Sequence, residues 1–173
     1  FTKLPQSLQD IINDKEKRKK LIIYINPPYA EHGNRATFAG EGEHKSSVAN
    51  TSKIYAKFSK TVGTATRELF AQFFLRVHEE IPDCHLASFS TLKFVNSQNF
   101  LKYRQYFKGE YKKGFICKAN TFDNVKGNFP IGFLIWDLSK KTEIKKVETD
   151  VVNENSEFIG LKNFYAFGSK DFI

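Results

Sequence analysis

The sequence predicts an α/β fold with a mostly parallel sheet that ends in an antiparallel β-hairpin. Strand-like and helix-like apolar segments alternate as far as Phe107, the order typical of parallel strands joined by crossover helices. Two strand-like segments, 111–118 and 130–138, then follow with a turn-rich connection between them, which predicts an antiparallel pair. A length of 173 residues with 15% aromatic side chains is enough for one domain with a packed core.

The first predicted elements are a helix and a buried strand. Residues 5–20 carry aliphatic side chains on one side and then a charged run, which predicts a single helix. Residues 21–25 form a continuous apolar run rich in isoleucine, typical of a strand covered on both faces. Pro27 and Pro28 end this strand, and proline restricts the preceding residue, so we expect Asn26 to be extended.

A long loop and a helix follow. Residues 31–63 show no clear periodicity and are rich in small polar residues. They predict a structureless loop, and a loop of such length inside a compact domain is often functional. Residues 64–80 place apolar side chains at helical spacing, with Thr64 or Thr66 as the cap and Pro82 just past the end.

The remaining elements complete the predicted fold. We expect a strand and its exit loop over 86–95 and a second helix over 97–107. Trp136, in the middle of the strand 130–138, is expected to lie in the core. Residues 143–152 and 158–167 are expected to form short strands or irregular segments.

Composition narrows the class of protein. A net charge of +8 suits a polyanionic partner, although a basic balance alone is weak evidence of nucleic-acid binding. No signal peptide or apolar stretch of membrane-spanning length is present, so we expect a soluble cytoplasmic protein with no membrane partner. The chain begins at Phe1 and contains no methionine, so we expect it to be part of a longer protein or a chain whose start has been removed.

The cysteines and histidines predict no special chemistry. Cys84 and Cys117 both occur in apolar surroundings, so we expect small buried side chains in a reduced compartment. The four histidines show no spacing typical of metal ligands, and no metal site is expected.

One tetrad carries most of the chemical information: Asn26-Pro27-Pro28-Tyr29, directly behind the apolar strand. It presents a side-chain amide oxygen, a fixed backbone carbonyl and an aromatic face at one point. That set suits holding a planar amino group together with its ring. The structural alternative is a stiff turn in which Tyr29 only packs.

Together with the segments that follow it, the tetrad resembles the catalytic half of bacterial N6-adenine DNA methyltransferases of restriction–modification systems. The resemblance covers about residues 20–140 and follows the order of the chain. It rests on the tetrad, the long polar loop, the helix over 64–80, the strand Leu86-Ala87-Ser88-Phe89 and the helix start Asn96-Ser97-x-x-Phe100.

The resemblance implies a fold, an activity and partners. The sheet would be part of a Rossmann-like methyltransferase sheet. Residues 1–140 would be the catalytic half that binds the target adenine, and 141–173 an extension leading toward a target-recognition region. The protein would transfer a methyl group from S-adenosylmethionine to double-stranded DNA, alongside other segments or subunits of a restriction–modification enzyme.

The resemblance also implies roles for individual residues. Adenine's exocyclic nitrogen is a poor nucleophile because its lone pair is delocalised into the ring. The side-chain oxygen of Asn26 and the backbone carbonyl of Pro27 would accept its two hydrogens and orient it. Tyr29 would stack on the base, which must first be flipped out of the duplex. A second aromatic ring opposite would be Phe122, with Phe129 as the competing candidate.

A basic stretch follows the tetrad. No acidic residue occurs between Glu43 and Glu68, and serines and threonines are interleaved with the basic side chains. Such a mixture suits contacts to DNA phosphates, although a solvated mobile loop is the alternative. The candidate phosphate contacts are Lys45, Lys53, Lys57, Lys60 and Arg67.

The motif expected for S-adenosylmethionine is missing. The usual device is a glycine-rich turn after the first strand of the sheet. The segment Phe38-Ala39-Gly40-Glu41-Gly42 has the glycines, but neither a buried strand before it nor an amphipathic helix after it. We therefore expect the main cofactor motif upstream and outside this chain. The alternatives are an amino-methyltransferase of RNA or of protein glutamine, or a truncated DNA-binding domain without activity.

Overall fold

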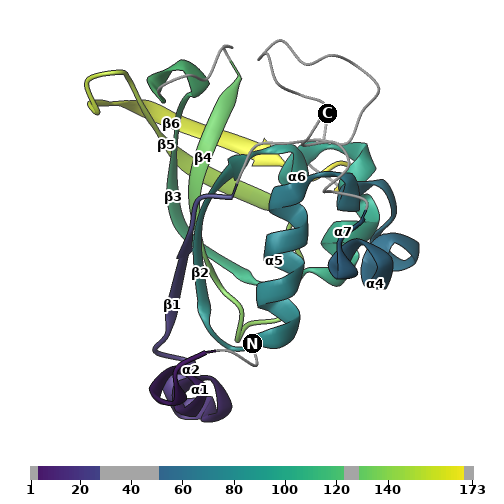
Figure 1. Ribbon diagram of the computed structural model, residues 1–173. Helices are drawn as coiled ribbons and strands as arrows, with labels where there is room; N and C mark the ends of the chain where they lie inside the picture. The colour runs from purple at the N-terminus through teal and green to yellow at the C-terminus, as the bar shows by residue number, and fades with distance from the viewer. Residues whose placement is uncertain (1–3, 28–50, 123–128, 170–173) are drawn as a thin grey trace.

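Six strands form one mixed sheet, and helices cover one of its faces (Figure 1). The computed structural model describes residues 4–27, 51–122 and 129–169. The order of strands across the sheet is β1-β2-β4-β3-β5-β6. Their bounds are β1 Ile22–Ile25, β2 His85–Thr91, β3 Glu110–Lys118, β4 Pro130–Asp137, β5 Lys146–Val152 and β6 Phe158–Tyr165.

The α/β class is confirmed, but the prediction of a mostly parallel sheet is wrong. Only β1 with β2 and β3 with β5 pair in parallel among the described strands. The pairs β2–β4, β3–β4 and β5–β6 are antiparallel. Short connections cannot carry the chain back across the sheet, so β3–β4 and β5–β6 form hairpins. Strand β4 lies between β2 and β3 and is antiparallel to both.

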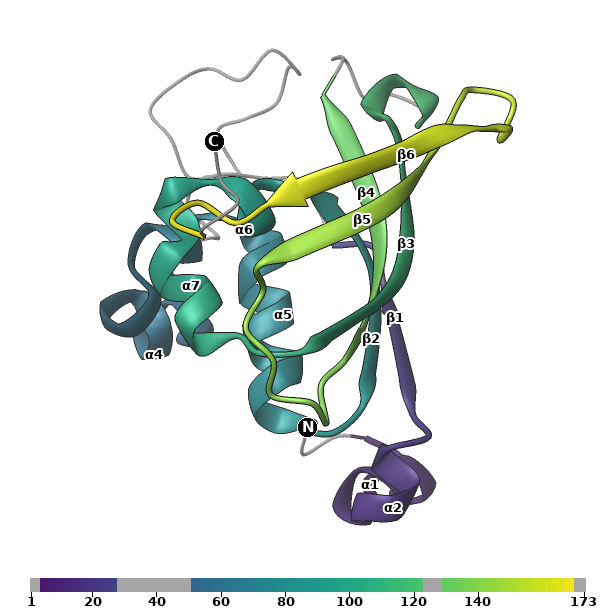
Figure 2. The same cartoon turned by 180° about the vertical axis from the view of Figure 1, so that it is seen from behind.

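The two segments near the end of the chain are regular strands. Residues 143–152 and 158–167 contain β5 and β6, which form a second antiparallel hairpin. This hairpin continues the sheet beyond β3 (Figure 2). Three side chains of β6, Phe158, Ile159 and Leu161, are 61–62% exposed.

The helices differ from the prediction in their breaks and starts. Within the described residues, the α-helices are α1 Gln6–Asn13, α2 Lys15–Arg18, α4 Lys53–Val62, α5 Leu69–Glu80, α6 Lys93–Asn96 and α7 Leu101–Tyr106. The 3-10 turns are η1 Gly63–Arg67, η2 Gln98–Phe100 and η3 Ala119–Thr121. The helix predicted over 97–107 is therefore η2 followed by α7.

The single helix predicted over 5–20 is wrong. Asp14 adopts an extended conformation and breaks the segment into α1 and α2. Its carboxylate accepts hydrogen bonds from the backbone N–H groups of Glu16 and Lys17, at 2.9 and 3.1 Å. A side-chain cap of this kind satisfies amide groups that have no partner within a new helix.

The structureless loop predicted over 31–63 is wrong for its last part, which forms α4. Ser52 caps this helix by accepting a hydrogen bond from the backbone N–H of Tyr55 at 2.9 Å. Only Phe58 and Val62 of the helix are buried. Ile54 packs against the core beside them, so the helix does carry apolar side chains at helical spacing.

The helix predicted over 64–80 begins later, at Leu69. The preceding residues form η1, in which the Thr66 hydroxyl donates to the carbonyl of Gly63 at 2.7 Å. Neither predicted threonine cap is therefore used, and no side chain caps α5 among the described residues. Thr66 instead tightens the turn that leads into the helix, and the Thr64 hydroxyl donates to the carbonyl of Asn99 at 3.4 Å.

The core lies between the helices and the covered face of the sheet. Phe94 is fully buried at its centre. Its ring lies 5.6–6.3 Å from the rings of Phe70, Phe74, Tyr103 and Trp136. Trp136 is 1% exposed, so its predicted place in the core is confirmed.

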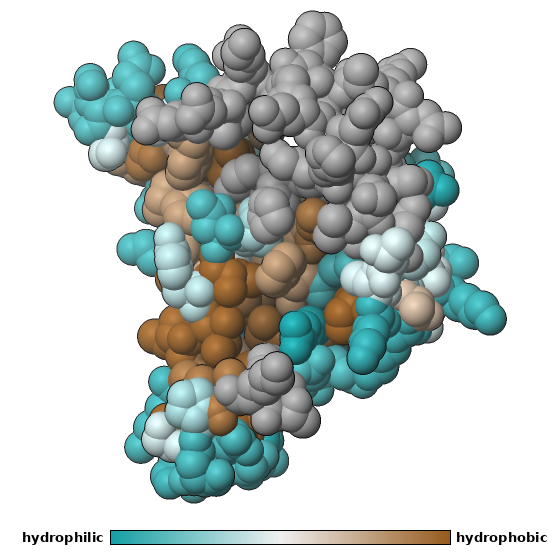
Figure 3. Space-filling model, in the orientation of Figure 1, coloured by the Kyte–Doolittle hydropathy of each residue, from teal (hydrophilic) through white to brown (hydrophobic). Residues whose placement is uncertain are grey.

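The other face of the sheet is partly open. In β1, Ile23 and Ile25 pack against the core, whereas Ile22 and Tyr24 are 65% and 64% exposed. The prediction that this strand is covered on both faces is therefore wrong. Hydrophobic surface gathers over β1 in the space-filling view (Figure 3). An alternating strand at a sheet edge buries one row of side chains and exposes the other.

Both cysteines are buried and free, as predicted. Burial raises the pKa of Cys84 to about 12, so this thiol stays protonated and unreactive. None of the described helices is long and apolar enough to cross a membrane.

His78 gives the fold a pH dependence that can be measured. Burial, followed by the nearby charge of Lys141, lowers its pKa from 6.5 to about 4. The rings of Tyr106 and Phe107 pack against it at 5.8 and 5.3 Å. The folded state therefore favours neutral His78, and its contribution to stability is complete above pH 6.5 and is lost as pH falls towards 4.

We expect the free energy of unfolding to fall less between about pH 7 and pH 4.5 in His78→Gln than in the parent chain. Urea unfolding at the two pH values measures this difference. An identical pH dependence in both proteins would show that His78 is not the group responsible.

Candidate functional site

The candidate site lies where β1 and β2 end. The two strands are parallel, with Ile25 opposite Ser88, so their carboxyl ends meet at one edge of the sheet. Asn26 directly follows β1, and Lys93 lies just past the end of β2. Helix α5 is joined to β2 by a short turn and runs in the opposite direction to it. The start of α5 therefore lies near the end of β2, at the same edge of the sheet (Figure 1). In open α/β sheets, ligands bind outside the carboxyl ends of the strands.

The structure describes two residues of the tetrad. Pro27 is buried and Asn26 is exposed. The buried proline anchors the backbone on which the asparagine side chain is presented. Pro28 and Tyr29 lie outside the described residues.

Phe122 and Phe129, the two residues predicted as candidates for stacking on the base, both lie at this same edge. Thr91 at the end of β2 pairs with Ile131 near the start of β4, which in turn pairs with Cys117 near the end of β3. Phe122 and Phe129 belong to the connection between β3 and β4. The register therefore brings both rings to the edge that carries Asn26.

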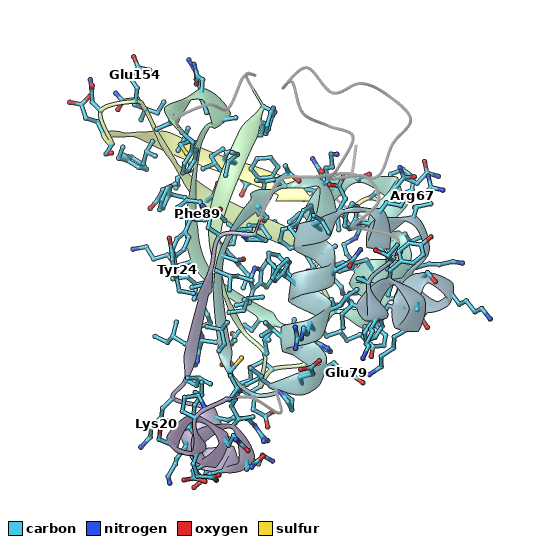
Figure 4. All side chains as sticks on the ribbon, in the orientation of Figure 1. Lys20, Tyr24, Arg67, Glu79, Phe89 and Glu154 are labelled. Carbon is cyan, nitrogen blue, oxygen red and sulfur yellow. The ribbon has the colours of Figure 1, made fainter. Side chains whose placement is uncertain are left out.

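Phe122 is part of an aromatic cluster on the open face of the sheet. Its ring meets that of Phe89 edge to face at 5.3 Å, and Phe89 lies 4.9 Å from Phe133. Tyr24 of β1 joins the cluster, 6.0 Å from Phe133. The labelled Tyr24 and Phe89 lie on the sheet side of the molecule, away from the helices (Figure 4).

The two candidate aromatic residues, Phe122 and Phe129, differ in burial and in the contacts of their rings. Phe122 is half-buried in the aromatic cluster, whereas Phe129 is 40% exposed. The Phe129 backbone carbonyl accepts a hydrogen bond from the Ala119 N–H at 3.0 Å. A ring already supported by its neighbours is the better platform for stacking, which favours Phe122.

Sequence reasoning missed Phe89 and Phe133 as parts of this cluster. Phe89 lies between two fully buried serines, Ser88 and Ser90. That alternation was visible in the sequence, and it places Phe89 on the face opposite the serines. Phe133 could not be found in the same way, because its position beside Phe89 depends on β4 pairing with β2.

The candidate phosphate contacts are not gathered in one place. Lys57 Nζ lies 2.7 Å from the carboxylate of Glu79, in the last turn of α5. Arg67 lies just ahead of that helix, and the labelled Arg67 and Glu79 are far apart (Figure 4). Lys53 and Lys60 are exposed on α4, and Lys45 lies outside the described residues.

Electrostatics show that Lys57 is engaged at the far end of α5. The hydrogen bond from Lys57 is the main reason why the pKa of Glu79 is lowered, and a second comes from the hydroxyl of Tyr106 at 2.8 Å. Lys57 therefore forms an ion pair on the surface. Arg67 lies just ahead of α5, near the edge that carries Asn26. Lys53 follows Ser52, whose hydroxyl donates a hydrogen bond to Gln72 in the first turn of α5.

A small polar cavity of about 220 Å³ opens beside Arg67. Its other polar lining residues include Glu68 and Lys93, which form an ion pair at 2.6 Å. Lys93 was missed in the sequence, although it follows the strand beside β1, just as Asn26 follows β1 itself.

The described residues do not fit S-adenosylmethionine by the usual device. None of the described glycines belongs to a Gly-x-Gly turn between a strand and a helix. Gly40 and Gly42 lie outside the described residues.

No protein-family model and no curated protein matches this chain. Among solved structures, its backbone is similar to the DrdV–DNA complex, with a TM-score of 0.49 and 18% identity over 78% of this chain and 15% of that one. A modification subunit of a putative type I restriction enzyme from Vibrio vulnificus YJ016 gives a TM-score of 0.49 at 12% identity, over 78% of this chain and 28% of that one. The DNA-bound type ISP restriction-modification enzyme LlaBIII gives a TM-score of 0.40 at 12% identity, over 80% of this chain and 10% of that one.

These similarities concern backbone architecture alone. The chain spans between 10% and 28% of the length of those three chains. The similarities do not identify the activity, the substrate or the partners of this chain.

Proposed function

We propose that this chain forms the acceptor side of a DNA adenine methyltransferase that uses S-adenosylmethionine and belongs to a restriction–modification system. The observation that carries the proposal is the place of Asn26-Pro27-Pro28-Tyr29, whose first two residues follow β1 at the carboxyl edge of the sheet. Phe122 reaches the same edge from the other side of β2. In this proposal, hydrogen-bond acceptors and an aromatic platform at one edge of the sheet hold a flipped adenine.

In this proposal each group has a defined task. The Asn26 side-chain oxygen and the Pro27 carbonyl accept the two hydrogens of the adenine amino group. They draw the nitrogen towards a tetrahedral geometry and aim its lone pair at the methyl donor, so catalysis rests on orientation and fixed dipoles. An amide oxygen accepts a hydrogen bond without placing a charge beside the base.

The aromatic residues would hold the base after it leaves the duplex. Flipping costs a few kcal/mol of stacking and pairing. Stacking on an aromatic ring returns about 1–3 kcal/mol per base. Tyr29 and Phe122 are assigned this task, with Phe129 as the alternative to Phe122.

The proposal divides the chain by task. Residues 1–140 supply the acceptor pocket. Residues 141–173 lead towards a target-recognition region and continue the same sheet through the β3–β5 pair. S-adenosylmethionine supplies the methyl group from parts of the enzyme outside the described residues, and duplex DNA with other segments or subunits of the enzyme are the partners.

A methyl-transfer assay with the complete gene product tests the proposal. Labelled S-adenosylmethionine is offered with unmethylated duplex DNA, with RNA or with a release factor. We expect label in DNA alone. Label in RNA or in the release factor would contradict DNA as the substrate. DNA binding without any S-adenosylmethionine binding in calorimetry would identify a domain without activity.

A further inference from the structure

The polar cavity at the start of α5 has the size and lining of a site for a small anion. It lies between η1, α6 and η2 and encloses about 220 Å³. Sites for whole small molecules generally measure 300–1,000 Å³, so this cavity suits a single group rather than a base or nucleoside. Buried Phe100 contributes to its wall, and its polar lining is Thr64, Arg67, Glu68, Lys93, Ser97 and Asn99.

The charges in the cavity favour an anion. Arg67 and Lys93 carry two positive charges and Glu68 one negative charge, which leaves an excess of one positive charge. The Glu68 side chain is 8% exposed and holds Lys93 Nζ at 2.6 Å, while Lys93 remains 46% exposed. The buried carboxylate therefore fixes the ammonium group of Lys93 at the mouth of the cavity.

Arg67 is available to a ligand. It is exposed, and within residues 4–27, 51–122 and 129–169 its guanidinium has neither a hydrogen bond nor an ion pair. Guanidinium stays charged at all relevant pH values and offers paired N–H donors that match two oxygens of a phosphate.

Neutral donors complete the lining. Ser97 Oγ accepts a hydrogen bond from the Asn99 backbone N–H at 3.3 Å, which leaves its O–H free to donate in another direction. The Asn99 side-chain amide adds a further donor, whereas the Thr64 hydroxyl donates to the Asn99 backbone carbonyl at 3.4 Å. Arginine, lysine, serine, threonine and asparagine are the side chains that contact DNA phosphates in protein–DNA complexes.

We infer that this cavity binds one phosphate of the DNA backbone close to the target nucleotide. The inference rests on the proposed function, because DNA must reach this edge of the sheet. Lys93 lies just past the end of β2 and Asn26 follows the adjacent parallel strand. A phosphate held by Arg67 and Lys93 fixes the DNA strand near the edge of the sheet at which its flipped base is held.

The test compares two arginines near opposite ends of α5. Arg67→Ala removes a charge from the cavity. Arg76→Ala is the matched control, because Arg76 is an exposed arginine that pairs with Glu80 in the last turns of α5. The affinity of the complete gene product for a mixed-sequence DNA duplex is measured by fluorescence anisotropy over a series of salt concentrations.

We expect Arg67→Ala to weaken binding severalfold and to make the slope of log affinity against log salt less negative by about 0.9, the value for one phosphate contact. Arg76→Ala should leave both unchanged. Ser97→Ala, which keeps every charge, should weaken binding with no change of slope.

Two outcomes overturn the inference and are distinguishable. If Arg67→Ala binds DNA with the parent's affinity and slope, the phosphate site is wrong and the proposed function is untouched. If the parent protein does not bind the duplex at all, both the site and the proposed function fail.

Discussion

Asn26→Ala is expected to lower the rate of methyl transfer by about 100- to 1,000-fold, the usual effect of removing one hydrogen-bonding group that acts on the reacting atoms. The amino group would lose one of its two acceptors, and its lone pair would remain delocalised in the ring. Asn26 is exposed at the end of β1, so the substitution creates no core cavity. Initial rates of methyl transfer to unmethylated DNA measure the effect.

Two variants make this test specific. Asn163→Ala removes another exposed asparagine, from β6, and should keep the parent's rate. Asn26→Asp keeps an acceptor oxygen but adds a charge, so it should fall between the parent and Asn26→Ala. If Asn26→Ala retains a rate within about twofold of the parent, the role that we give to Asn26 at the reacting nitrogen is wrong.

Phe94→Ala is expected to lower the free energy of unfolding by about 3–5 kcal/mol. Phe94 is fully buried, and four aromatic rings surround it within 6.3 Å. Neighbours in a close-packed core collapse only partly into a new cavity. Since domains are stable by about 5–15 kcal/mol, the variant would lose a large share of its stability.

Chemical denaturation with urea measures this loss. Phe158→Ala is the control, because Phe158 is 62% exposed at the start of β6 and its loss should change stability by less than about 0.5 kcal/mol. Equal destabilisation by the two substitutions would contradict the placement of Phe94 at the centre of the core.

The sequence predicted those parts of the fold that depend on neighbouring residues. The strand before Asn26, the β3–β4 hairpin and the buried Trp136 all follow from local patterns of apolar residues. The insertion of β4 between β2 and β3 does not, because it depends on which distant strand offers an open edge. Helix α4 was missed although Ile54, Phe58 and Val62 have helical spacing, because this short apolar pattern follows a long polar stretch.

The candidate site divides in the same way. The place of Asn26 at the end of a strand was predicted correctly, since one short segment determines it. The polar cavity beside Arg67 was not predicted, because η1, α6 and η2 form it only after the chain folds. Basic residues adjacent in sequence were a poor guide to this site: Lys57 pairs with Glu79 while Arg67 lines the cavity.

The central claim is that this chain holds an adenine amino group for methylation. Mass spectrometry of nucleosides tests it most directly, using unmethylated DNA incubated with S-adenosylmethionine and the complete gene product. We predict N6-methyldeoxyadenosine in the digest, and its absence when Asn26→Ala replaces the parent. A methyl group on a cytosine instead, or the same yield of methyladenine from Asn26→Ala, would contradict the claim.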